Sequence, residues 1–204
     1  MKIFQLLLPF IFFFSSNSFA DSPLTSTQFY KAYESVQIVQ DAANSKGILT
    51  EKLMNYLSDP SHPIDIKVAL INRLGWNING KHNANLFIQF LQKTKGYQSI
   101  KDLKERASSH ELLCIGYLLA MDNYKDVKEA LIFSTLSATK EPKSYTIQMI
   151  NALILSQTFS YGNWCKKYEV VQKVKTATNL TFDFKSEATD IIFQYISSYK
   201  SYCK

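Results

Sequence analysis

Glycine and proline, the residues that most often mark turns and linkers, are scarce in this chain. Only 6 glycines and 5 prolines occur in 204 residues, and no stretch gathers them with serine. This composition excludes a flexible linker between two domains. We therefore expect one folded unit over residues 21–204.

Alternating strand patterns are also missing. The best alternation covers residues 179–184, where Leu180, Phe182 and Phe184 are separated by polar residues. So short a stretch is more typical of an extended connector than of a sheet. The fold class predicted from the sequence is all-α.

Recognisable catalytic motifs are absent as well. No Gly-x-Ser-x-Gly sequence occurs, and no histidine lies three or four residues from another, as metal ligands on one helix would. Residues 75–82 approach the phosphate-binding pattern Gly-x-x-x-x-Gly-Lys-Ser/Thr, but His82 replaces the hydroxyl that ligates magnesium. His110 and Cys114 share a helical face and could form half of a nucleophile site, although the apolar neighbours of Cys114 are typical of a core residue. We predict no catalytic residue, no metal site and no cofactor.

Neither basic nor acidic residues are concentrated in any one segment of the chain. The chain has 23 basic and 17 acidic residues, and its formal net charge is +6. Because acids are scattered among the bases, no basic run is dense enough to indicate nucleic-acid binding. A mildly basic surface fits an acidic protein and the anionic cell envelope equally well.

Residues 1–20 have the three parts of a cleavable signal peptide. They comprise the basic Lys2, an apolar block over residues 3–14, and the small residues Ser18 and Ala20 at positions −3 and −1 of a cleavage site. The apolar block is shorter than the roughly 20 residues that span a bilayer. The next residue is not cysteine, so a lipid anchor there is not expected. We predict export to the periplasm or the extracellular space without stable membrane insertion after cleavage; an uncleaved anchor is the alternative.

The three cysteines are expected to form one disulfide. Exported proteins meet an oxidising environment, in which paired thiols persist as disulfides. Cys165 and Cys203 lie in polar segments rich in lysine and tyrosine, whereas Cys114 lies in an apolar run. Cys165 opens one predicted helix and Cys203 follows the next long one, so antiparallel packing would bring them together. We predict a Cys165–Cys203 bond and a free, buried Cys114.

Apolar spacing is helical along nearly the whole mature chain. Apolar residues recur at i, i+3, i+4 and i+7 in Ala84–Leu91, for example, and Ser108 with Glu111 predicts a capping box. Gly75 and Gly96 each follow a periodic stretch and indicate helix ends. The predicted helices cover residues 25–44, 50–58, 63–74, 83–94, 99–106, 109–122, 126–139, 144–160, 164–176 and 185–201.

Three similar turns indicate an internal repeat. Residues 75–77, 122–124 and 162–164 each follow an apolar helix and combine an asparagine with an aromatic residue, and their asparagines are 46 and 40 residues apart. A period near 40 is found in stacked antiparallel helical hairpins of the HEAT or tetratricopeptide kind. The consensus positions of those repeats do not match, so an irregular helical bundle remains the alternative.

Stacked hairpins would place these turns in one row. The row would carry aromatic residues beside amide and basic groups, which is the composition of protein-binding hot spots. We expect Trp76 and the residues up to Asn83 to be exposed, and Trp164 to pack onto its own hairpin. The candidate partner-binding residues are Trp76, Asn77, Asn79, Lys81, His82, Asn83, Tyr124 and Trp164.

These patterns favour an exported protein-binding protein that acts by surface complementarity. Immunity proteins, which neutralise a toxin, and envelope adaptors have this kind of build, but fold alone does not fix function. The alternative is an enzyme of unrecognised type that uses His82 or His110 with nearby polar residues.

Overall fold

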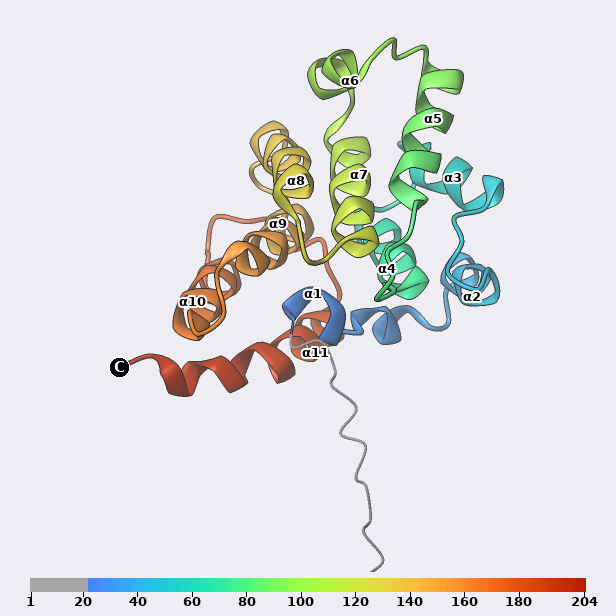
Figure 1. Cartoon of the computed structure of the whole chain (residues 1–204). Coiled ribbons are helices and arrows are strands. Elements are labelled where there is room, and N and C mark those ends of the chain that lie inside the picture. Colours follow the sequence, from blue (N-terminus) through green and yellow to red (C-terminus); the bar gives the residue numbers. More distant parts are fainter. Residues whose placement is uncertain (1–21) are drawn as a thin grey trace, which may run out of the picture.

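The computed structural model describes residues 22–204, so the predicted signal peptide and its cleavage site lie outside the described residues. Within residues 22–204 the chain is helical, with one isolated bridge between Ser144 and Thr181, and the all-α class is confirmed (Figure 1). In chain order, the helices are α1 (Pro23–Ser26), the 3-10 helix η1 (Phe29–Tyr33), α2 (Gln37–Asn44), α3 (Glu51–Ser58), α4 (Ile64–Leu74), α5 (Asn83–Lys95), α6 (Ile100–Arg106), α7 (Ser109–Asp122), α8 (Lys128–Lys140), α9 (Tyr145–Thr158), α10 (Trp164–Lys175), α11 (Ser186–Ile196) and the 3-10 helix η2 (Ser197–Tyr202).

Helix α7 is the centre of the core. Its apolar residues lie on all sides rather than on one stripe, as expected of a helix surrounded by others, and it packs against α3, α4, α5, α8 and α9. Close approach of α8 depends on Gly116, since a Cβ there would lie 2.9 Å from the backbone oxygen of Ala130 and from the backbone nitrogen of Ser134. The capping box of Ser108 and Glu111 begins this helix, as predicted.

The helices pack in hairpin-like pairs, but the chain does not run on as an open row. Helix α7 packs on α8 and α9 packs on α10, while the last helix, α11, contacts η1 and α1 at the start of the chain (Figure 1). In an open solenoid each repeat contacts only its neighbours. The return of α11 to the first helices is therefore a feature of an irregular bundle.

The single helix predicted over residues 25–44 is wrong. The chain there forms α1, η1 and α2, and the cause is a buried side chain far away in sequence. Asn72 of α4 accepts a hydrogen bond from the backbone N–H of Tyr30 (3.0 Å) and donates one to the carbonyl of Thr27 (3.0 Å). These bonds satisfy backbone groups that a continuous helix would have paired internally. The break turns Phe29 into the core, where its ring lies 5.4 Å from that of Phe184.

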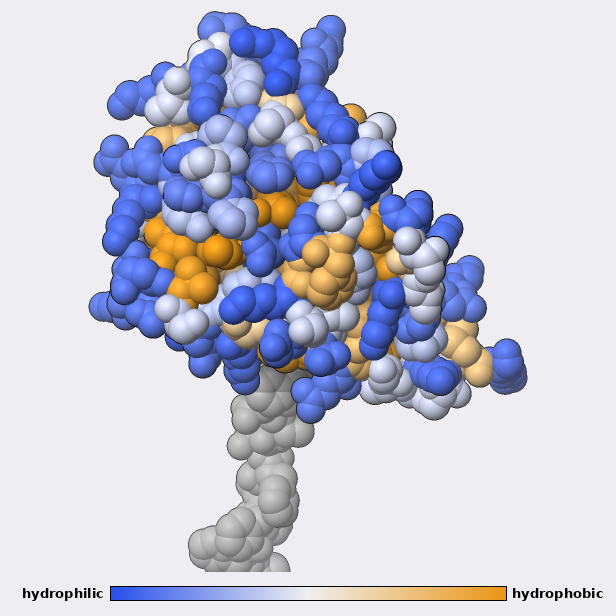
Figure 2. All heavy atoms as spheres, turned by 180° about the vertical axis from the view of Figure 1, so that it is seen from behind, coloured by the Kyte–Doolittle hydropathy of each residue, from blue (hydrophilic) through white to orange (hydrophobic). Residues whose placement is uncertain are grey.

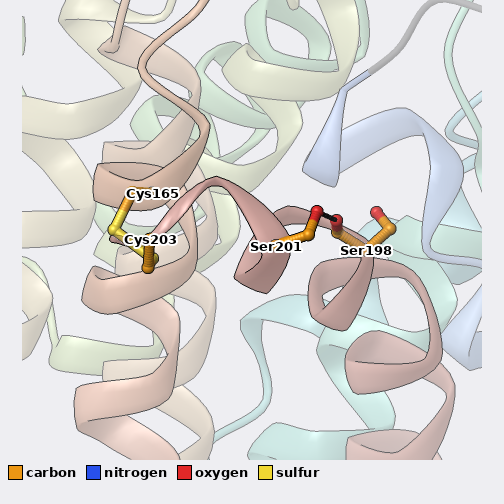
Figure 3. The surroundings of a disulfide bond; sticks show 4 residues. All are labelled: Cys165, Ser198, Ser201 and Cys203. Atoms are coloured by element: carbon orange, nitrogen blue, oxygen red, sulfur yellow. Dashed lines mark hydrogen bonds between the residues drawn. A yellow bond between two sulfur atoms is a disulfide. The ribbon is translucent and has the colours of Figure 1, made fainter.

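The predicted disulfide is confirmed. Cys165 in the first turn of α10 is bonded to Cys203, and their Cα atoms are 4.8 Å apart. The 3-10 helix η2, within which the Ser201 hydroxyl donates to the carbonyl of Ser198, packs against α10 and carries Cys203 back to Cys165 (Figure 3). Cys114 is free and buried, also as predicted.

Among residues 22–204, no helix combines the length and the apolar character needed to cross a bilayer.

Candidate functional site

The loop over residues 76–82, hereafter the 76–82 loop, connects α4 to α5 and is fixed at its C-terminal end by Lys81. The Lys81 Nζ donates to the carbonyls of Leu74 (2.6 Å) and Gly75 (2.8 Å), and so caps the end of α4 with a cation. The backbone N–H of Lys81 donates to the carbonyl of Asp122 at the end of α7 (3.1 Å). Lys81 is therefore committed to holding the loop.

Asn83 is buried, which corrects the expectation that it is exposed. Only 5% of its surface is accessible, its Oδ1 accepts from the backbone N–H of Leu49 (2.9 Å), and its Nδ2 donates to the carbonyl of Gly47 (3.0 Å). The side chain links the start of α5 to the segment before α3. Asn83 supports the loop from beneath and does not belong to its accessible surface.

The structure brings two of the three repeated turns into direct contact. The ring of Trp76 meets that of Tyr124 edge to face, with 5.0 Å between the centroids, and Tyr124 is largely buried. The Nε2 of Gln157, in the last turn of α9, donates to the carbonyl of Tyr124 (2.9 Å). The ends of α4, α7 and α9 therefore meet along one edge.

Trp164 belongs to a separate aromatic cluster. Its ring lies 5.0 Å from that of Tyr161 and 5.0 Å from that of Tyr199, and it is largely buried. Tyr202 follows at 6.2 Å, next to the disulfide. Trp164 thus packs within its own hairpin and against η2, in agreement with the sequence expectation, and it does not extend the surface around Trp76.

The exposed tip of the 76–82 loop is a short turn over residues 77–80. Asn77 Oδ1 accepts from the backbone N–H of Asn79 (2.9 Å), and Gly80, with φ of 80°, donates its N–H to the carbonyl of Asn77 (2.9 Å). This turn projects Ile78, which is 58% exposed, while Asn77, Asn79 and His82 are also exposed. Ile78 was not selected from the sequence. An apolar residue in the middle of a polar turn could have indicated an exposed apolar side chain.

The carboxylate beneath the loop has an unusual electrostatic setting. Asp122 Oδ2 accepts from the backbone N–H of Ala84 in the first turn of α5 (2.8 Å), whereas Oδ1 is buried and has no hydrogen-bond partner among the described residues. Burial raises the pKa of Asp122 to about 6, although the N–H of Ala84 and the charges of Lys81 and His82 favour the ionised form. Burial also lowers the pKa of Lys81. A pocket of about 350 Å³ opens beside Asp122, and Asp126, Lys128 and Glu129 also line it.

Replacing Asp122 with asparagine should remove a contribution to stability that falls as the pH rises. Because the folded-state pKa of about 6 lies above the unfolded value of 3.8, the folded state binds more protons between these limits, and its stability falls as the pH rises through this window. The unfolding free energy at pH 4 minus that at pH 7 should be about 2 kcal/mol smaller in Asp122→Asn than in the parent protein. Urea unfolding at both pH values measures it, and unchanged differences would contradict a protonatable Asp122.

The two histidines considered for catalysis lie at opposite ends of α7. His82 lies near Asp122, which bonds the backbone of Lys81 and Ala84, whereas His110 is in the first turn of α7. His110 and Asp122 are 12 positions apart, which is about 18 Å of helix. His110 Nε2 lies 3.6 Å from the carboxylate of Glu141, and burial lowers the pKa of the imidazole. The structure does not bring the two histidines together.

The cysteines offer no reactive thiolate. Burial raises the pKa of the Cys114 thiol to about 12, so this thiol is not a nucleophile at neutral pH. The sulfurs of Cys165 and Cys203 and a carboxylate oxygen of Glu169 lie within 4.8 Å of one another. Since the two sulfurs are bonded to each other, they are not thiolate ligands for a metal.

Comparison of the chain with protein-family models, with curated proteins and with solved structures finds no match.

Proposed function

We propose that the protein is exported and binds another protein through the tip of the 76–82 loop. The observation that carries the proposal is Ile78, an aliphatic side chain that is 58% exposed on a loop whose other groups hold it in place. An immunity protein and an envelope adaptor both act by such surface complementarity.

Preorganisation supports this assignment. The loop is tied to α4 by Lys81 and to α7 by the Asp122 carbonyl, and Trp76 packs against Tyr124 below it. A loop that is already ordered loses little conformational entropy when a partner binds, so more of the contact energy appears as affinity. The exposed amides of Asn77 and Asn79 flank Ile78 and supply the polar rim that surrounds a binding anchor.

Export is supported by the disulfide. A bond between Cys165 and Cys203 is compatible with an oxidising compartment and uncommon in a reducing one. A partner reached in the periplasm or outside the cell fits the same compartment.

A crosslinking experiment tests the loop as the contact surface. We expect a photoreactive phenylalanine analogue at position 78 to give one discrete, light-dependent adduct with a protein of the source organism's cell envelope or medium. The matched control position is Ile132 of α8, which is 50% exposed and does not belong to the 76–82 loop. The same analogue there should give no such adduct.

Competition then distinguishes a specific contact from a sticky side chain. Excess parent protein should suppress the adduct, Ile78→Asp should be at least about ten-fold weaker as a competitor, and Ile132→Asp should match the parent. Both substitutions are at exposed positions and should change the melting temperature by less than about 2 °C. Trp76→Ala is less suitable, because Trp76 packs against the core. Equal adducts at positions 78 and 132, or equal competition by Ile78→Asp, would refute the proposal.

A further inference from the structure

A groove formed by residues of α8, α9 and α10 and by the segment over residues 177–180 contains no residue of the 76–82 loop. Helix α9 packs against both α8 and α10 and forms the floor between them. The pocket has a volume of about 470 Å³, within the range of about 300–1,000 Å³ typical of small-molecule sites. Figure 2 shows, on the face opposite to that of Figure 1, that hydrophobic residues reach the surface in separate patches among hydrophilic ones.

One end of this groove is closed by a fixed segment. The backbone N–H of Thr181 donates to the carbonyl of Lys143 (2.7 Å), and the N–H of Tyr145 donates to the carbonyl of Thr181 (3.0 Å). These bonds hold Asn179 and Leu180 against the start of α9, where they line the groove. This wall of the groove is therefore fixed by backbone hydrogen bonds.

Its lining is aliphatic. Ala152 and Leu155 of α9 and Val170 and Val174 of α10 are among its apolar residues, and no aromatic residue lines the groove. A flat aromatic ligand would find no ring on which to stack. The lining suits a flexible aliphatic chain.

Three of the polar side chains that line the groove have donor groups without a partner among the described residues. Lys173 lines it, and its amine forms no hydrogen bond or ion pair among the described residues. Asn151 Oδ1 accepts from the hydroxyls of Ser134 (2.8 Å) and Thr135 (3.4 Å), which leaves its amide N–H groups free to donate. The side chain of Asn179 likewise has no partner among the described residues.

The acidic residues nearest to the groove in sequence contact groups outside it. Glu141 accepts from the Ser109 hydroxyl (2.6 Å), and Asp183 accepts from the Ser144 hydroxyl (2.6 Å). The carboxylate of Glu169, one turn before Lys173, lies at the disulfide. No acidic residue lines the groove, so its only formal charge is the positive charge of Lys173.

From this complementarity we propose that the groove binds an aliphatic carboxylate, such as a medium-chain fatty acid. The tail lies on the aliphatic wall of α9 and α10, and the carboxylate pairs with Lys173, within the same pocket as the amide donors of Asn151 and Asn179. Binding in this groove does not require the 76–82 loop, which contributes no residue to it.

Titration with sodium decanoate below its micellar concentration tests the site. Calorimetry should show saturable binding at one site, and decylammonium, which has the same tail and the opposite charge, should bind at least about ten-fold more weakly. Lys173→Glu should reverse that preference. The control Lys101→Glu makes the same charge change on exposed α6 and should leave it intact.

A second pair of variants tests the position of the tail. Thr139 of α8 lines the groove and Thr94 of α5 does not, yet both are exposed and both hydroxyls donate to the carbonyl four residues earlier, at 2.9 Å and 2.8 Å. Thr139→Trp should fill the groove and abolish decanoate binding, while Thr94→Trp should bind like the parent. The proposal is overturned if the parent shows no saturable binding, if decylammonium binds equally well, or if Thr139→Trp still binds decanoate.

Discussion

Loss of the Cys165–Cys203 disulfide, through Cys165→Ala with Cys203→Ala, should lower the free energy of unfolding by about 4 kcal/mol. The two residues are 38 positions apart, so the bond closes a long loop and removes many conformations from the unfolded chain. The double variant should also unfold with a steeper dependence on urea, because its unfolded chain is more expanded. Equilibrium unfolding in urea gives both quantities.

A reductant supplies the control for the side chains removed. Reduction of the parent protein should produce nearly the same loss of stability as the double variant, and reduction of the double variant should change nothing further. Cys114 stays a buried thiol in every sample, so it does not contribute to the difference. If the parent and the reduced parent unfold at the same urea concentration, the bond does not constrain the unfolded state as argued.

The disulfide could be predicted because its signals are local. The polar surroundings of Cys165 and Cys203 and the apolar run around Cys114 distinguish the pair from the buried thiol without any knowledge of the fold. The helices after residue 50 were predictable for the same reason, since periodicity and capping residues lie within each segment. Their observed ends differ from the predicted ones by one or two residues in most cases, which is the ordinary uncertainty of a helix end.

At the candidate site, local sequence patterns predicted the loop but not the burial of Asn83. The turn sequence around Trp76 correctly indicated a polar loop between two helices, and its asparagines do form a tight turn. Which side chains face inward was decided by distant segments, however, since Asn83 is buried by its bonds to Gly47 and Leu49. A polar residue at the start of a helix is expected to be exposed unless the distant partner that buries it is known.

The helix prediction for residues 25–44 failed for a related reason. Their apolar spacing is compatible with one helix, and the interruption is imposed by Asn72, 42 residues after Tyr30 and 45 after Thr27. No propensity within residues 25–44 reports a hydrogen-bonding group on another helix. The break is thus a tertiary effect, and removing Asn72 tests it.

We expect Asn72→Ala to destabilise the protein by about 3 kcal/mol. Asn72 is 5% exposed, and besides its bonds to Tyr30 and Thr27 its Nδ2 donates to the hydroxyl of Tyr117 (2.8 Å), which is fully buried. Alanine would leave three polar groups unpaired, each at a cost of about 1–3 kcal/mol. The lower end of that range applies, because a pocket of about 180 Å³ beside Asn72 has room for water to replace some of the bonds.

Two further variants separate the network from the loss of an asparagine. Asn55→Ala, at an exposed position of α3, should change the free energy of unfolding by less than about 0.5 kcal/mol. Tyr117→Phe removes only the hydroxyl and should cost about 1 kcal/mol, because Asn72 keeps its two backbone partners. Hydrogen exchange should show the protection of the Tyr30 amide reduced in Asn72→Ala and retained in Tyr117→Phe. If Asn72→Ala costs no more than Asn55→Ala, the break between α1 and η1 is set by the packing of Phe29 alone.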